Sequence, residues 1–252
     1  MLSIISLNVE RSKPLDRIIP FLKEQKPDVF CVQELMERDV ALFAETLGSV
    51  AHVFAPMSLI ISETPPNVCG TGIFSRLPIR SQEIRTYATK SETMPELDVR
   101  DSKTWNNKKF VLPVVDVETE GEIMRVASTH FRWTPDGRAD DAQRSDLKEL
   151  FKEFDSLGEF VVCGDFNAPR GGEIFAALTA RLRDNIPPEY DWSVDIPLHR
   201  NNTALLEDIK KAGLTGLMVD GLFSTPAYTV SNVTLVNGVS DHAAIAATVE
   251  KR

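Results

Sequence analysis

The sequence predicts a mixed α/β fold in which β-sheets pack on one another and are covered by helices. Strand-like apolar runs recur along the whole chain, whereas few segments have helical periodicity. The runs at 110–117 and 123–129 are joined through Glu120-Gly121, which predicts a β-hairpin with antiparallel pairing. A purely parallel, dinucleotide-binding sheet is disfavoured as well, because no G-x-G-x-x-G turn follows the first run. The predicted strands lie at 2–7, 28–33, 50–55, 70–75, 110–117, 123–129, 159–164, 217–224, 227–236 and 243–249.

Helices are predicted where apolar residues recur three and four positions apart. One such pattern begins at Leu15 and ends before Pro27, because proline cannot continue the helix. The polar stretches 86–109 and 184–201 lack clear periodicity and are predicted as long loops, which often carry function. The predicted helices lie at 15–22, at 36–47, at 147–154, after Gly172 and at 202–212.

The composition is that of an ordinary globular protein. The chain has 252 residues, of which 42% are hydrophobic and 26% charged, and we expect one domain over residues 1–252. A formal net charge of −9 disfavours a broad basic surface for nucleic acid, although basic groups can still gather locally. A monomer is favoured.

The cytoplasm is the expected location. The apolar run 2–7 has no cationic stretch before it and is interrupted at Asn8, unlike a signal peptide. No segment approaches the roughly 20 apolar residues that cross a bilayer. The cysteines Cys31, Cys69 and Cys163 are scattered, which favours buried free thiols in a reducing compartment.

Several predicted strands end in a polar side chain that can take part in catalysis. The first four cases along the chain are Asn8, Glu34, His130 and Asp165. Such residues are also common in turns, and Glu34 could cap the following helix. Four strands that deliver Asn, Glu, His and Asp to their carboxyl ends nevertheless indicate convergence at one edge of the fold. Further candidates follow a strand or precede the last one, namely Asn167, Asp220, Asp241 and His242.

These residues lie in short motifs that occur in a recognisable order over nearly the whole chain. The motifs are Leu7-Asn8, Val32-Gln33-Glu34, the segment 72–79, Thr129-His130-Phe131, Gly164-Asp165-Phe166-Asn167, the segment 219–223, and Ser240-Asp241-His242. Together they resemble the endonuclease/exonuclease/phosphatase superfamily, which includes DNase I-like nucleases, abasic-site endonucleases, inositol phosphatases and neutral sphingomyelinases. The resemblance implies a four-layered α/β sandwich with two mixed β-sheets face to face and helices outside. It also implies a metal-dependent hydrolase of phosphate esters.

The resemblance implies a Mg²⁺ site, at which Mn²⁺ could substitute. Glu34 would be the principal carboxylate ligand, with Asn8 and Asp241 as further ligands. Oxygen ligands suit this hard ion, which keeps several waters and meets the substrate phosphate directly.

The resemblance also implies roles in catalysis. Asp165 would orient or deprotonate the attacking water, while Asn167 and His130 would donate hydrogen bonds to phosphoryl oxygens. His242, oriented by Asp220, would act either as the base or as an imidazolium that stabilises charge. The choice of base between Asp165 and His242 stays open.

The substrate is expected to be a phosphodiester, either nucleic acid or a small molecule. The alternatives are a phosphatase or phospholipase that acts on inositol phosphates or sphingomyelin, and a catalytically silent member that binds phosphate. The two long loops, 86–109 and 184–201, would decide the choice. Candidate substrate-binding residues follow motif strands or lie in these loops, namely Arg76, Arg132, Arg170 and Trp192.

Overall fold

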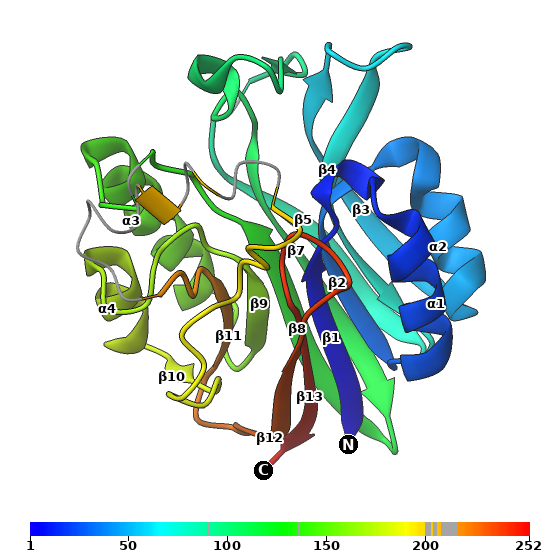
Figure 1. Ribbon diagram of the computed structural model, residues 1–252. Coiled ribbons are helices and arrows are strands. Elements are labelled where there is room, and N and C mark those ends of the chain that lie inside the picture. The colour runs from blue at the N-terminus through cyan, green and yellow to red at the C-terminus, as the bar shows by residue number, and fades with distance from the viewer. Residues whose placement is uncertain (90, 136, 200–202, 204–205, 208–215) are drawn as a thin grey trace.

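The computed structural model describes residues 1–89, 91–135, 137–199, 203, 206–207 and 216–252. Within these residues the strands form two sheets, one of seven and one of six strands (Figure 1). The first sheet contains β1 (Leu2–Asn8), β2 (Val29–Met36), β3 (Ala51–Ile60), β4 (Asn67–Ser75), β6 (Glu96–Leu97), β12 (Tyr228–Val236) and β13 (Ala244–Lys251). The second contains β5 (Ile79–Ala88), β7 (Phe110–Thr119), β8 (Glu122–His130), β9 (Val161–Asp165), β10 (Arg183–Asp184) and β11 (Asp220–Ser224). Their orders are β12-β13-β1-β2-β4-β3-β6 and β10-β11-β9-β8-β7-β5.

Helices cover the outer face of each sheet. They are α1 (Leu15–Gln25), α2 (Val40–Leu47), α3 (Asp141–Asp155) and α4 (Glu173–Thr179). Leu22 of α1 and Phe43 of α2 pack on the first sheet, and Leu150 of α3 and Leu178 of α4 pack on the second. Figure 1 shows the two helix pairs on opposite sides of the molecule. No helix in the described part of the chain is long and apolar enough to cross a membrane.

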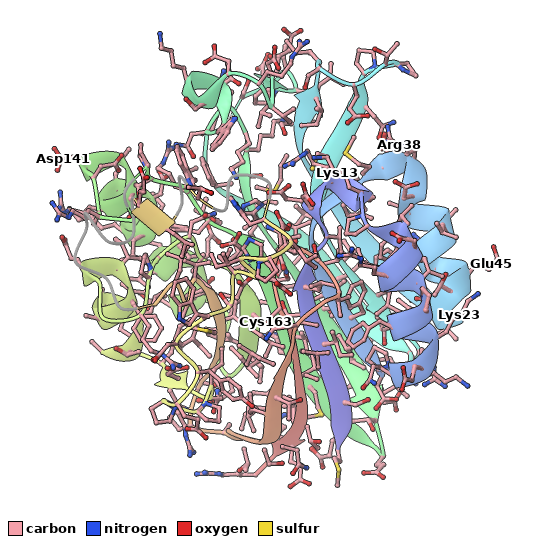
Figure 2. All side chains as sticks on the ribbon, viewed as in Figure 1. Lys13, Lys23, Arg38, Glu45, Asp141 and Cys163 are labelled. Atoms are coloured by element: carbon pink, nitrogen blue, oxygen red, sulfur yellow. The ribbon has the colours of Figure 1, made fainter. Side chains whose placement is uncertain are left out.

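The sheets pack face to face through a second set of apolar side chains. Strand β2 shows why: Phe30 and Val32 face the helices, whereas Val29 and Cys31 face the other sheet, because successive side chains alternate. Cys163 of β9 lies in this inner layer (Figure 2). The fold is therefore the predicted four-layered α/β sandwich, and the three cysteines are buried free thiols.

The predicted hairpin is confirmed. Strands β7 and β8 pair antiparallel, with Thr119 opposite Glu122. Glu120 and Gly121 form the two-residue turn with φ of 51° and 83°, and positive φ at both positions suits the right-handed twist of the flanking strands.

Other elements differ from the prediction. Strand β5 was not predicted, because it is an edge strand whose residues 80–84 are exposed and mostly polar. The predicted loop 86–109 therefore begins inside β5, and it also contains β6. Helix α2 begins at Val40 rather than at residue 36, and β11 begins at Asp220 rather than at 217. The helix predicted at 202–212 lies almost entirely outside the described residues.

The topology brings polar strand ends together at one edge of the sandwich. Strands β1 and β2 are parallel, with Asn8 opposite Gln33, so Asn8 and Glu34 leave the first sheet at the same edge. In the second sheet, β8 and β9 are parallel and β11 is antiparallel to β9, so His130 and Asp220 both flank Asp165. A site at this edge draws on both sheets.

Candidate active site

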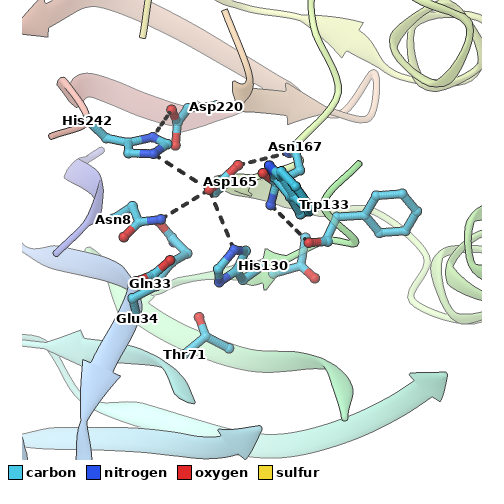
Figure 3. Close-up of polar contacts among 12 residues, drawn as sticks. Asn8, Gln33, Glu34, Thr71, His130, Trp133, Asp165, Asn167, Asp220 and His242 are labelled. Atoms are coloured by element: carbon cyan, nitrogen blue, oxygen red, sulfur yellow. Dashed lines mark hydrogen bonds and ion pairs between the residues drawn. The ribbon is translucent and has the colours of Figure 1, made fainter. Parts of the chain in front are cut away.

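Asp165, the last residue of β9, lies at the centre of the polar cluster (Figure 3). Asn8 Nδ2 donates a hydrogen bond to Asp165 Oδ2 at 3.1 Å, and the backbone N–H of Asn167 donates to Oδ1 at 2.8 Å. Two imidazoles face the same carboxylate, with His130 Nε2 at 3.6 Å and His242 Nε2 at 3.9 Å from Oδ2. Asp165 is 2% exposed, so these groups replace the water that would otherwise solvate its charge.

His242 is held by Asp220 from the other side of its ring. The distance from Nδ1 to Asp220 Oδ2 is 2.7 Å, and Nδ1–H must be the donor because a carboxylate only accepts. Burial disfavours the charged ring, but the Asp220 carboxylate outweighs burial and raises the pKa of His242 well above its usual value. This shift favours the imidazolium form of His242, whose Nε2 lies 3.9 Å from Asp165 Oδ2.

The pKa values of Asp165 and His130 are both shifted in the direction that favours the neutral form of the group. Burial and the negative charge of Asp220 raise the pKa of Asp165, which makes this carboxylate a stronger base. Burial and the charge of Lys108 lower the pKa of His130 to about 4. His130 is therefore neutral at neutral pH and can donate only one hydrogen bond.

The local backbone conformation explains the residue types in the Gly164-Asp165-Phe166-Asn167 motif. A Cβ atom at Gly164 would lie 2.0 Å from the backbone oxygen of Thr129, and φ there is 144°, so glycine is needed. Asn167 has φ of 48°, a region that asparagine tolerates. One Asn167 Nδ2 hydrogen is donated to the Phe131 backbone oxygen at 3.1 Å, which leaves the second for a ligand.

Glu34 and Arg11 form an ion pair on the other wall of the pocket. The register of β2 shifts between Val32 and Leu35, and Glu34 has φ of 55°, as in a β-bulge that re-aims a side chain. Arg11 Nη1 lies 2.5 Å from Glu34 Oε2. Burial would raise the pKa of Glu34, but Arg11 and weaker neighbouring cations lower it to about 2.

Glu34, Asp241 and Asn8 carry the carboxylate and amide oxygens that a hard divalent cation prefers as ligands. Asp241 lines the pocket with Glu34, and burial together with the charge of Glu34 raises the pKa of Asp241 to about 6. Negative charge is thus incompletely compensated here. Asn8 Oδ1 accepts one hydrogen bond from Glu10 N–H at 3.1 Å, and its second lone pair remains available.

Another group of side chains has potential metal-ligand atoms close together. Ligand atoms of Asp165, Asp220 and His242 lie within 4.8 Å of one another. Their proximity is already explained by the hydrogen bond between His242 Nδ1 and Asp220 Oδ2, which occupies one ring nitrogen. We therefore interpret this group as an Asp–His–Asp arrangement rather than as a metal centre.

A pocket with a volume of about 210 Å³ opens between these groups. One water needs roughly 10–15 Å³ by the same measure, so a phosphate with part of its esterified alcohol would fit. The pocket floor is formed by four charged or titratable side chains, Lys108, His130, Asp165 and His242, and Asp220 contacts His242 without lining the pocket. Its apolar wall includes Leu97, Val99, Trp105 and Trp133, and the two indoles meet edge to face at 4.7 Å between centroids.

Sequence reasoning assigned no role to Lys108 or Trp105, although both line the pocket. Lys108 and Trp105 lie in the predicted loop 86–109, where acidic residues largely offset the basic ones. Burial of one lysine within a polar stretch has no pattern in the sequence, so only the fold distinguishes it from its neighbours.

The structure corrects the prediction for Arg76. Strand β4 runs antiparallel to β2, and its last residue Ser75 pairs with Val29 at the start of β2. Arg76 therefore lies at the opposite edge of the sheet from Glu34, where Nη1 donates to the Lys26 backbone oxygen at 2.8 Å.

Arg132, Arg170 and Trp192 are also not brought to the pocket lining among the described residues. Arg132 Nε donates to Asp146 at 2.5 Å, and its guanidinium lies over the Phe110 ring. Arg170 donates to Asp184 and to backbone oxygens within 186–190. Trp192 is partly buried. The positions of both arginines are thus explained by the partners that their guanidinium groups bind within the fold.

Comparison with known proteins gives fold relatives of diverse activity. The catalytic domain of human Nocturnin with bound sulfate has a TM-score of 0.70 at 15% identity, covering 100% of this chain and 93% of the other. D. rerio TDP2 with a single-strand DNA product has a TM-score of 0.67 at 17% identity, covering 99% of both chains. A Bacteroides thetaiotaomicron mannosyl-6-phosphatase has a TM-score of 0.65 at 16% identity, covering 99% and 100%. No curated protein matches the sequence.

The four layers and the acidic, imidazole-lined edge define a protein of the DNase I-like class. The model of the Endonuclease/Exonuclease/phosphatase family matches residues 5–242, so the chain belongs to this family. Its members are hydrolases that act on phosphate esters.

Proposed function

We propose that the protein, as one catalytic domain over residues 1–252, is a Mg²⁺-dependent phosphodiesterase that hydrolyses a nucleic-acid or small-molecule phosphodiester. The observation that carries this proposal is the setting of Asp165. A buried carboxylate of raised pKa stands between a charged His242 and a neutral His130, beside a pocket that admits a phosphate. This arrangement suits activation of a water and stabilisation of phosphoryl charge.

Glu34 and Asp241, with Asn8 beside them, would hold the divalent cation. Their oxygens match its chemistry, and their incompletely compensated negative charge supports the assignment. When bound, such a cation neutralises phosphoryl oxygens and polarises the ester.

The remaining steps fall to side chains of the pocket floor and to Asn167. Asp165 accepts the proton of the attacking water, because its pKa is raised whereas that of His242 favours the charged ring. As the water oxygen bonds to phosphorus, the ester P–O bond on the opposite side breaks, and the departing alkoxide takes a proton from solvent. His242 and the free Asn167 Nδ2–H donate to phosphoryl oxygens as charge builds during in-line displacement. Neutral His130, whose Nε2 accepts from the Lys108 ammonium at 3.4 Å, supplies a further hydrogen bond through Nδ1–H, and Asp220 keeps the His242 ring oriented and charged.

A substrate panel with Mg²⁺ and with EDTA tests the proposal. The panel contains abasic duplex DNA, 5′-tyrosyl oligonucleotide, single-stranded DNA and RNA, bis-p-nitrophenyl phosphate, inositol phosphates and sphingomyelin. We expect turnover of at least one diester with Mg²⁺ and its loss with EDTA. Glu34→Ala should lower the rate by at least about a hundredfold, whereas Glu45→Ala, on the exposed face of α2, should not change it. Turnover that survives EDTA, or a fully active Glu34→Ala variant, contradicts the mechanism.

A further inference from the structure

Lys108 is a lysine enclosed in the pocket by the fold. It lies two residues before Phe110, the first residue of β7, and is 6% exposed. The neighbouring Lys109 N–H donates to the Met57 backbone oxygen at 2.9 Å, which fixes the backbone here. The ammonium lies 5.6 Å from the centroid of the Phe110 ring and lines the pocket. Its position is therefore set by strand β7 rather than by a flexible surface stem.

The ammonium of Lys108 has fewer partners than its burial requires. It carries three donors, yet among the described residues its hydrogen-bond partner is His130 Nε2 alone, at 3.4 Å. No carboxylate oxygen of a described residue forms a salt bridge with it within 4.0 Å. Burial accordingly lowers its pKa, although Glu34 and Asp165 act in the opposite direction from farther away. A buried, under-paired ammonium is costly for folding and is typical of a group that meets a ligand.

A purely structural role explains the geometry less well. The counter-ion of Glu34 is already Arg11, at 2.5 Å. Asp165 is held by Asn8 and by the Asn167 N–H. Neither carboxylate has a direct contact with Lys108, so the ammonium keeps two donors for which the described residues supply no acceptor within hydrogen-bond distance.

We propose that Lys108 is a catalytic residue that binds a non-bridging oxygen of the substrate phosphoryl group and stabilises the charge that develops there. The inference rests on the proposed function. His130 Nε2 lies between Lys108 Nζ at 3.4 Å and Asp165 Oδ2 at 3.6 Å. A phosphoryl group placed for attack by a water at Asp165 is therefore within reach of the Lys108 ammonium. Phosphate oxygens would provide the acceptors that the protein does not.

Inorganic phosphate, a probe that needs no turnover, tests this assignment. Phosphate is titrated calorimetrically, with Mg²⁺ present, into the wild type, Lys108→Met, Lys108→Arg and the neighbouring control Lys109→Met. Loss of one charge-assisted hydrogen bond should weaken phosphate binding by Lys108→Met on the order of tenfold to a hundredfold. Lys108→Arg should restore part of the affinity, and Lys109→Met should bind as the wild type does.

Thermal unfolding of the same proteins separates function from structure. Lys108→Met should melt at or above the wild-type temperature, because methionine fills a similar volume without a buried charge. Unchanged phosphate affinity in Lys108→Met overturns the inference, as does a wild type that does not bind phosphate. A lower melting temperature together with unchanged affinity assigns Lys108 to the fold. The proposed function fails separately, if the wild type hydrolyses no phosphodiester in the panel.

Discussion

Two charged regions of this molecule differ in how completely their groups are paired. In the Arg170 clamp, formed by Arg170, Asp184 and backbone oxygens within 186–190, the guanidinium makes four hydrogen bonds of 2.8–3.1 Å. On the pocket floor, Lys108 has one hydrogen bond, at 3.4 Å, and the two imidazoles approach Asp165 no closer than 3.6 Å. Paired charge fixes a loop in place, whereas under-paired charge lowers stability and leaves donors and acceptors for a substrate.

The largest effect should follow from removing the central carboxylate of the pocket floor. We expect Asp165→Asn to lower kcat on the order of a thousandfold or more, because the amide is not a base. Its melting temperature should stay equal or rise, since the variant removes repulsion between Asp165 and Asp220. The matched variant Asp184→Asn in the Arg170 clamp should instead lower the melting temperature and leave kcat unchanged. A near-wild-type rate for Asp165→Asn would remove it from its role and weaken the comparison.

A smaller loss of rate is expected when the partner of His242 is neutralised. Asp220→Asn keeps a side chain of similar shape but removes the charge that stabilises the imidazolium across 2.7 Å. We expect kcat to fall on the order of a hundredfold, measured with the best substrate of the panel. Retention of the wild-type rate would show that Asp220 supports only the fold of β11.

The Arg170 clamp should respond in stability rather than in rate. Arg170→Met leaves Asp184 and several carbonyls without their donor, and we expect a loss of about 3 kcal/mol in the free energy of unfolding. The measurement is urea denaturation, with kcat per folded molecule determined in parallel. A selective fall in kcat would contradict a purely structural clamp and return Arg170 to the predicted substrate-binding set.

The smallest effect concerns an ion pair on the second sheet. Arg125 donates to both oxygens of Asp116, at 2.8 and 2.9 Å, and these bonds lower the pKa of Asp116. A lowered pKa gives stability above the unfolded value of about 3.9, and this stability is lost as pH falls through the folded value. Because the pair is partly exposed, we expect about 1 kcal/mol or less. The gap in melting temperature between wild type and Asp116→Asn should therefore narrow as the pH falls below about 3.9, and a constant gap would contradict the pairing.

The sequence predicted the layered architecture because buried strands such as β2 are continuous apolar runs. Strand β5 escaped prediction since its residues 80–84 are exposed and mostly polar, so apolar alternation is weak. The residues Asn8, Glu34, His130 and Asp165 were found from the strand ends they occupy. Arg76 was placed at the wrong edge because sequence order does not tell whether a strand runs parallel or antiparallel to its neighbour. Lys108 could be recognised only from its burial in three dimensions.

The position of the site across both sheets has a mechanical consequence. Glu34 and Asn8 belong to one sheet and Asp165 and His130 to the other, and among the described residues no strand pairing joins the two sheets. The inner apolar layer, which includes Cys31 and Cys163, aligns them together with a few side-chain hydrogen bonds such as Asn8 to Asp165 and Gln33 to Ser128. Because that layer is closely packed, it is hardly compressible and holds the two sheets at a fixed separation. A side chain there that is enlarged by one methylene would shift one half of the proposed active site relative to the other, so the rate of the proposed reaction should be sensitive to packing far from any reacting atom.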